Sequence, residues 1–144
     1  MIAVEPKGKE LEPCLKAKQR LWSNPPQFID TIAEGIMTQQ VSQFQNTYIN
    51  QKFIFKYDIF QTGHLTFPIL CDLVEDTVIT VTNEDMLKAM KLVAERMKIV
   101  IEASAGASVA AAIFHTNEIL MHYPDVSKIG VILCGGNTVL PNFP

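Results

Sequence analysis

The sequence predicts an α/β fold built around a parallel sheet, because strand and helix patterns alternate along its second half. Residues 78–81 (Val-Ile-Thr-Val) suit a short strand, and helical patterns follow them. Residues 129–134 then form a continuous apolar run, which is typical of a strand buried on both faces of a parallel sheet. A sharp turn at residues 135–137 (Gly-Gly-Asn) closes this strand. The order strand, helix, helix, buried strand is that of an α/β fold.

Two helices are predicted between these strands. The first begins at a capping-box-like Thr82-Asn-Glu-Asp, with acids at the positive helix end, and runs from about residue 83 to 101. Its apolar residues recur at helical spacing on one face: Met86, Met90, Val93, Met97 and Ile101. The second helix, residues 105–122, is crowded with alanine, glycine and serine. Small residues let helices approach closely, so this helix is predicted to be central and buried.

The first part of the chain contributes a further strand. Residues 2–4 form a short apolar run that ends at Glu5-Pro6, and a short helix is predicted over residues 13–22 before the stop at Pro25-Pro26. Ligands of open α/β sheets bind beyond the carboxyl ends of the strands. Glu5 and Cys134 both fall at such ends.

Composition limits the class of protein. The 144 residues are 48% apolar and 19% charged, which is typical of one globular domain. The net charge of −3 has no basic stripe, which argues against nucleic acid as a partner. No apolar run approaches membrane-spanning length, so no membrane association is predicted. Three cysteines without CxxC spacing suggest neither a disulfide framework nor a zinc site, and favour the cytoplasm.

Several short motifs occur in one order that resembles the C-terminal third of serine racemases and serine/threonine dehydratases, which are fold-type II pyridoxal-phosphate (PLP) enzymes. They are residues 4–6 (Val-Glu-Pro), 25–26 (Pro-Pro), 31–35 (Thr-Ile-Ala-Glu-Gly), 67–69 (Phe-Pro-Ile), 72–74 (Asp-Leu-Val), 81–85 (Val-Thr-Asn-Glu-Asp), 95–98 (Glu-Arg-Met-Lys), 102–106 (Glu-Ala-Ser-Ala-Gly) and 134–137 (Cys-Gly-Gly-Asn). The resemblance implies that residues 1–144 are the C-terminal part of the large domain of a tryptophan synthase β-like PLP enzyme. The expected fold is an incomplete parallel sheet with flanking helices.

The resemblance also implies a cofactor-binding set. Cys134 matches the position where the family places a serine or cysteine beside the pyridine nitrogen of PLP, a neutral partner that suits elimination or racemisation. Glu102 would lie near the ring edge, and Gly135 and Asn137 would belong to the same site. Without the resemblance, Cys134 is a small residue that ends a strand. Glu102 alone would be a solvated or capping group.

Metal and nucleotide sites are implied in the same way. Glu5 resembles the family's carboxylate for Mg²⁺ or Ca²⁺, with Glu10 or Glu12 as a second acidic ligand. A charged surface loop is the alternative. Lys98 and Asn137 resemble residues that contact ATP, an activator that binds between subunits in the racemases. A solvated lysine is the alternative there.

Departures from the family are as informative as the matches. No lysine lies in a Ser-x-Lys-x-x-Gly setting, and the only Gly-Gly is at 135–136, so neither the Schiff-base lysine nor the phosphate loop is present. Residues 37–61 have no family counterpart and are predicted to be an insertion. The family converts L-serine to D-serine or deaminates serine to pyruvate and ammonia. This chain is therefore predicted to be catalytically inactive alone. It would be a truncated product, a gene-model fragment, or a non-catalytic partner of a full-length relative. The resemblance is also compatible with a homodimer.

Overall fold

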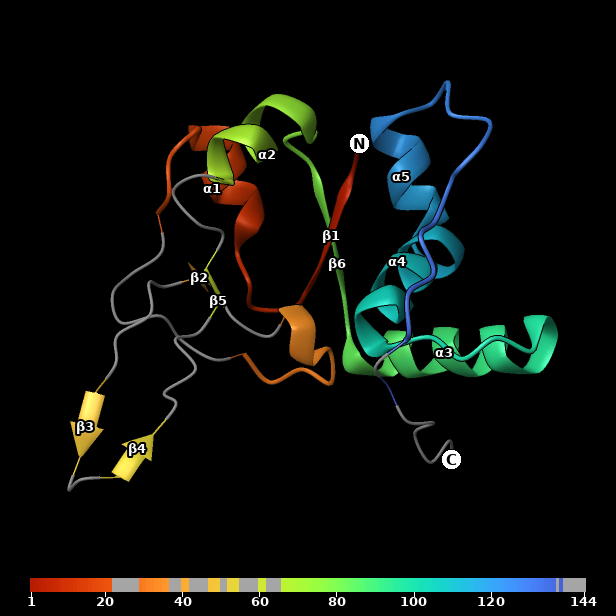
Figure 1. Cartoon of the computed structure of the whole chain (residues 1–144). Coiled ribbons are helices and arrows are strands. Elements are labelled where there is room, and N and C mark those ends of the chain that lie inside the picture. The colour runs from red at the N-terminus through yellow and green to blue at the C-terminus, as the bar shows by residue number, and fades with distance from the viewer. Residues whose placement is uncertain are drawn as a thin grey trace.

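A parallel pair of strands lies at the centre of the molecule. The computed structural model describes residues 1–21, 29–36, 40–41, 47–49, 52–54, 60–61, 66–136 and 138. Strand β1 (Ala3–Pro6) pairs with β6 (Val78–Val81), with Ala3 opposite Val78 (Figure 1). The predicted parallel sheet with flanking helices is therefore confirmed. β1 extends two residues beyond the predicted run, and the Lys7 N–H continues the ladder to the Val81 carbonyl at 3.1 Å.

Side chains of β6 alternate between two apolar clusters, as the period of a strand requires. Val78 packs in one cluster with α1 (Leu11–Ala17) and α2 (Phe67–Leu73). Ile79 and Val81 pack in the larger cluster with α3 (Asn83–Met97) and α4 (Ala103–Phe114). Figure 1 shows α1 and α2 on one side of the strand pair and α4 on the other. Both faces of the pair are thereby covered.

Helix α3 begins where the sequence predicts and ends earlier. The Thr82 hydroxyl accepts from the Asp85 N–H at 3.1 Å, and the Asp85 carboxylate accepts from the Thr82 N–H at 3.1 Å, so the predicted capping box is confirmed. The predicted end near residue 101 is wrong, because Lys98 adopts the left-handed conformation (φ 59°) and terminates the helix. Ile101 is nonetheless buried, at 2% exposure.

The second predicted helix forms two helices. α4 ends at Phe114, His115 leaves the helical conformation (φ −113°, ψ 21°), and α5 (Thr116–His122) follows. The prediction of a close approach is confirmed at Gly106, where a Cβ atom would meet Met90 Cγ at 2.9 Å. A larger side chain there would push α4 away from α3.

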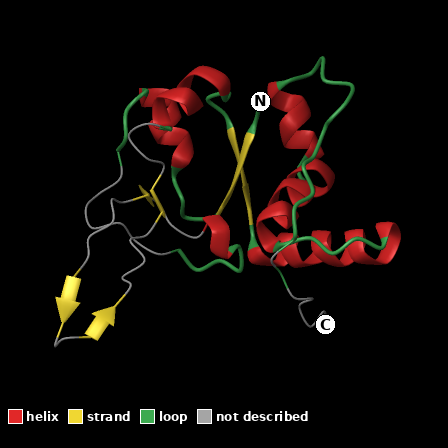
Figure 2. Ribbon diagram, in the orientation of Figure 1, coloured by secondary structure: helices red, strands yellow, loops and turns green. Residues whose placement is uncertain are grey.

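The strand predicted over residues 129–134 does not form. The segment is extended but has no strand pairing, and Ile132 is 84% exposed. Figure 2 shows it as a loop that runs back along the helices. A buried strand needs neighbouring strands for its N–H and C=O groups. Within the part of the chain that the structure describes, β1 and β6 pair only with each other.

The remaining elements are short. α1 begins before the predicted start of that helix at residue 13 and ends before the predicted end at 22, at a left-handed Lys18. A 3₁₀ helix, η1, spans Glu34–Ile36. Within residues 37–61, β2 (Gln40–Val41) pairs with β5 (Phe60–Gln61), and β3 (Thr47–Ile49) pairs with β4 (Lys52–Ile54), both antiparallel. The rest of that segment and Pro25-Pro26 lie outside the described residues, so the insertion stays a prediction. No described helix is long and apolar enough to cross a membrane.

Candidate cofactor site

Cys134 and Glu102 lie together, as the resemblance implies. The Cys134 thiol donates to Glu102 Oε1 at 3.4 Å, and the Glu102 N–H donates to the Cys134 carbonyl at 2.9 Å. Glu102 is the N-cap of α4 and has extended backbone (φ −76°, ψ 162°). Its side chain is therefore free to turn away from the helix towards the segment that carries Cys134. Two hydrogen bonds join residues that are 32 positions apart in sequence.

The Cys134–Glu102 contact keeps the thiol uncharged. The hydrogen bond to the Glu102 carboxylate raises the pKa of Cys134, and burial adds a smaller effect in the same direction. The thiol is therefore protonated at neutral pH. A neutral, weakly donating side chain is what the family places beside the pyridine nitrogen of PLP.

Gly135 must be a glycine because the backbone passes close to the start of α4. A Cβ atom at this position would lie 2.6 Å from the Val100 carbonyl oxygen and 2.8 Å from Ile101 Cα. The neighbouring Gly136 is exposed and meets nothing within 4 Å. Asn137 lies outside the described residues.

A pocket of about 610 Å³ opens beside this contact. Glu102 and Ser104 line it from the first turn of α4, Glu34 and Gly35 from η1, and Gly136 from the glycine turn. The pocket is also lined by Ile32, Leu87, Met90, Ala103 and Thr138. Its size suits a cofactor or an amino-acid adduct.

Sequence reasoning missed three polar residues of this pocket: Glu34, Ser104 and Thr138. Glu34 and Ser104 lie inside motifs that carry the family resemblance, residues 31–35 and 102–106, and these motifs were the available signal. η1 packs directly on α4, since a Cβ atom on Gly35 would lie 3.1 Å from Ser104 Oγ. A carboxylate and a hydroxyl therefore approach the pocket from different elements.

Lys98 lies apart from the residues that line the pocket. Its side chain turns back on α3, and Nζ donates to the Glu95 carbonyl at 2.7 Å. The side chain is exposed. The nucleotide role of Lys98 stays a prediction.

Glu5 is a buried carboxylate, at 5% exposure. Burial raises its pKa to about 7, and the Leu11 N–H, which donates to Oε2 at 2.9 Å, and the charge of Lys9 both oppose that shift. The carboxylate of Glu12 is engaged elsewhere, with Lys16 and with the Val78 N–H at 3.4 Å.

The metal role of Glu5 stays a prediction. Mg²⁺ and Ca²⁺ take six or more oxygen ligands, which include water and backbone carbonyl oxygens as well as carboxylates. Among the described residues, no group of three or more His, Cys, Asp or Glu side chains could hold a metal ion. The negative charges of Glu12 and Glu10 both act to raise the pKa of Glu5.

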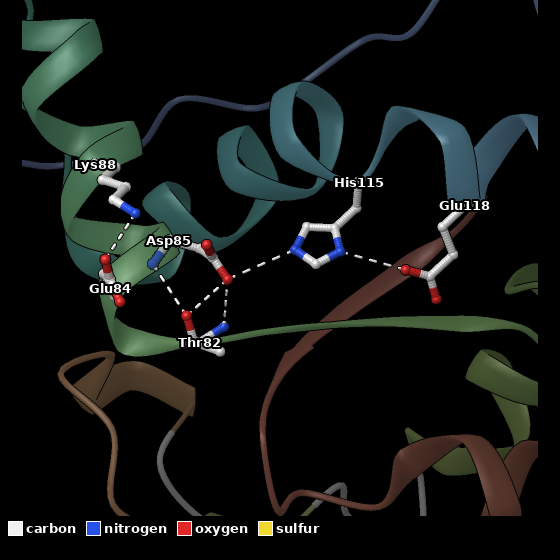
Figure 3. A network of polar contacts seen from close by, with 6 residues as sticks. All are labelled: Thr82, Glu84, Asp85, Lys88, His115 and Glu118. Atoms are coloured by element: carbon white, nitrogen blue, oxygen red, sulfur yellow. Dashed lines mark hydrogen bonds and ion pairs between the residues drawn. The ribbon is translucent and has the colours of Figure 1, made fainter.

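A polar network ties the first turn of α3 to the junction of α4 and α5 (Figure 3). His115 Nε2 lies 3.6 Å from Asp85 Oδ2, and His115 Nδ1 lies 3.3 Å from Glu118 Oε2. The imidazole thus lies between two carboxylates, one on each of two helices. No residue of this network lines the pocket, but the network joins the α4–α5 junction to α3, whose residues Leu87 and Met90 do line the pocket.

Comparison with known proteins identifies the same family as the sequence motifs. Residues 1–135 match the family described as pyridoxal-phosphate dependent enzymes. Serine racemase of Dictyostelium discoideum is 44% identical over 78 residues, which are 54% of this chain and 23% of the relative. Serine racemase of Oryza sativa subsp. indica is 30% identical over 97% of this chain and 34% of its own length.

A solved structure extends the likeness to the whole chain. The crystal structure of a pyridoxal 5′-phosphate-dependent aspartate racemase superposes with a TM-score of 0.76 and 44% identity, covering 99% of this chain and 37% of that one. The chain thus spans about a third of the length of proteins that it matches from end to end. It belongs to the family of pyridoxal-phosphate dependent enzymes.

Proposed function

We propose that these residues form the C-terminal part of the large domain of a serine racemase-like PLP enzyme. In the intact, cytoplasmic enzyme, the reactions would be racemisation of L-serine to D-serine and deamination of serine to pyruvate and ammonia. The observation that carries the proposal is the Cys134–Glu102 contact beside the pocket, within a family match over residues 1–135.

PLP, when bound to an amino acid, acidifies the α-proton of that amino acid. The residues of this chain would hold the ring. Cys134 would place an uncharged thiol beside the pyridine nitrogen, and Glu102, which accepts the S–H hydrogen bond, would keep that thiol protonated. Gly135 would let the segment that carries Cys134 lie close to the start of α4, and Asn137 is included in the site by the resemblance alone. Glu34 from η1 and Ser104 from α4 supply further polar groups to the pocket, which substrate substituents would contact.

These 144 residues alone supply no Schiff-base lysine in a Ser-x-Lys-x-x-Gly setting. We therefore expect the purified chain to produce neither D-serine nor pyruvate from L-serine and PLP, and to show no internal aldimine absorbance band. Turnover by the isolated chain would refute this part of the proposal.

Co-expression with the N-terminal two-thirds of a serine racemase tests the positive part. Restored activity in the mixture, absent from either piece, is the expected result. Cys134→Ser should retain this activity because the family uses either residue. Cys134→Asp should reduce it by about tenfold or more, since a carboxylate would hold the pyridine nitrogen protonated. Equal activity of the Asp and Ser variants would contradict the assignment of Cys134.

Aspartate is the second candidate substrate. The aspartate racemase structure covers nearly the whole chain at higher identity than the rice serine racemase does. The reconstituted enzyme would decide between the two, because a serine-specific site forms D-serine and an aspartate-specific site forms D-aspartate from the matching L-amino acid.

A non-catalytic role is the alternative if reconstitution fails. The chain would then dock onto a full-length relative and modulate it, which is compatible with the large apolar side chains that it exposes. Co-purification with such a relative, together with a change in that relative's activity, would support this alternative.

A further inference from the structure

Asn83, the first residue of α3, makes two hydrogen bonds to the loop of residues 29–36. Its Nδ2 donates to the Asp30 carbonyl at 3.2 Å, and its Oδ1 accepts from the Ile32 N–H at 3.1 Å. These partners lie 53 and 51 positions away in sequence. They also fix which way the amide faces, because a carbonyl needs a donor and an N–H needs an acceptor.

Helix α3 does not need this amide for its own start. Thr82 is the N-cap and exchanges both hydrogen bonds of the capping box with Asp85. Alanine forms helix at least as well as asparagine does. The side chain of Asn83 therefore serves the loop and not the helix.

The 29–36 loop and α3 both line the pocket beside the Cys134–Glu102 contact. The loop contributes Ile32, Glu34 and Gly35, and α3 contributes Leu87 and Met90. Figure 1 shows the loop, in orange, beside the first turn of α3. Asn83 is not among the residues that line the pocket, but it joins two elements that are.

Side chains from distant parts of the sequence hold the loop at both ends. Asn83 holds its start, and Lys9 Nζ donates to the Ile36 carbonyl at its end, at 3.1 Å. Between them, Ala33 is fully buried in the larger apolar cluster, and the Ile36 N–H donates to the Ala33 carbonyl at 2.9 Å. Loss of the Asn83 amide would thus release residues 30–32 and leave residues 33–36 attached.

We infer that Asn83 is a positioning residue, which places Ile32 and the adjoining η1 at the pocket where the amino-acid substrate binds. It acts through the backbone of the loop. The role in substrate binding rests on the proposed function, whereas the two hydrogen bonds do not.

Amide hydrogen exchange of the 144-residue chain, followed by NMR, tests the effect on the loop. Asn83→Ala should make the Ile32 amide exchange about fivefold faster, because one hydrogen bond of ordinary strength is lost. Asn83→Asp should keep the wild-type rate, since a carboxylate still accepts from the Ile32 N–H. The Asp85 amide, which bonds within the capping box, should exchange equally in all variants.

The matched control is Glu84→Gln, which alters the next residue of the same helical turn and loosens only its exposed pair with Lys88. The Ile32 amide should exchange in this variant as in the wild type. An unchanged Ile32 rate in Asn83→Ala would overturn the inference. A fivefold faster rate in Asn83→Asp would overturn it too, and this second variant keeps the test decisive if Asn83→Ala does not fold.

Kinetics of the enzyme reconstituted with the N-terminal two-thirds of a serine racemase test the effect on the pocket. Asn83→Ala should raise KM for L-serine by roughly three- to tenfold with a smaller change in kcat, because the misplaced residues bind substrate. Asn83→Asp should restore most of this loss, and Glu84→Gln should match the wild type. Unchanged KM together with faster Ile32 exchange would refute the positioning role. Failed reconstitution would count against the proposed function, and the exchange rates would still decide whether Asn83 holds the loop.

Discussion

The Cys134 thiol donates a hydrogen bond to a carboxylate 3.4 Å away, and this hydrogen bond, together with the negative charge, opposes loss of the thiol proton. The thiolate is the nucleophilic form of cysteine. Replacing Glu102 by Gln removes the charge but keeps a hydrogen-bond acceptor. We expect Glu102→Gln to increase the rate of iodoacetamide alkylation at Cys134 by roughly two- to tenfold at pH 8, measured by mass spectrometry of the Cys134 peptide.

The control for this change is Glu95→Gln, which removes an exposed carboxylate from α3. Alkylation of Cys134 should be unaffected by it. The same rate in wild type and Glu102→Gln would mean that the carboxylate does not control the thiol.

Backbone packing at Gly135 leads to a second expectation. A methyl group there would enter the space of the Val100 carbonyl and Ile101 Cα, so the 134–136 segment or the start of α4 would have to move. We expect Gly135→Ala to lower the free energy of unfolding by about 1–3 kcal/mol in urea titrations. Gly130→Ala is the matched control, because a Cβ at Gly130 meets nothing within 4 Å. Equal losses in the two variants would contradict the close approach.

At the scale of one element, the capping box of α3 makes stability depend on pH. The hydrogen bond from the Thr82 hydroxyl lowers the pKa of Asp85 below its ordinary 3.8, and His115 adds to the effect. A lowered carboxyl pKa contributes stability above the ordinary value, and this contribution is lost as pH falls through the folded-state value. The wild type should therefore lose stability steeply below about pH 4.

The variant Asp85→Asn should lose less stability at low pH than the wild type, measured as the change in the free energy of unfolding between pH 6 and pH 3. Thr82→Ala should cost about 1 kcal/mol at neutral pH, since it removes the N-cap. Lys88→Met is a control that breaks the exposed pair with Glu84 and leaves the hydrogen bonds of the capping box in place. If the free energy of unfolding fell as steeply with pH in Asp85→Asn as in the wild type, Asp85 would not be the cause of the acid sensitivity.

Local signals explain which elements could be predicted from sequence. The start of α3 was predictable because Thr82 and Asp85 are three residues apart and make the cap themselves. Its end was not, because a lysine in the left-handed conformation, such as Lys98, looks like any other lysine in a sequence. The break at His115 has no glycine or proline to mark it either.

Non-local partners explain what could not be predicted. The apolar run at residues 129–134 has the composition of a buried strand, but a strand exists only where another strand pairs with it. The Cys134–Glu102 contact was predictable only through family motifs, because nothing local relates residues 32 positions apart.

At the scale of the whole molecule, a two-stranded sheet leaves much apolar surface uncovered. Ile132 is 84% exposed on an extended segment without strand partners among the described residues, and further apolar side chains are exposed: Ile99, Val100, Ile113, Phe114 and Ile129. Extended apolar segments pair readily with other chains. We expect the isolated chain to self-associate as its concentration rises in size-exclusion chromatography.

A charge on the extended segment should reduce this association. Ile132→Lys is expected to increase the monomer fraction without lowering the melting temperature, because the side chain is not part of the core. Ser127→Lys adds the same charge at an exposed position of the same loop. If both variants increased the monomer fraction equally, net charge and not the segment would be responsible.

The pairing of β1 with β6 also has a consequence for how the polypeptide is synthesised. Ala3 and Val78 are paired but lie 75 positions apart, so β1 leaves the ribosome long before its partner exists. At about 5–20 residues per second, this delay is roughly 4–15 s. During that time β1 lacks this partner, and the β1–β6 pair can close only after residues 78–81 have emerged.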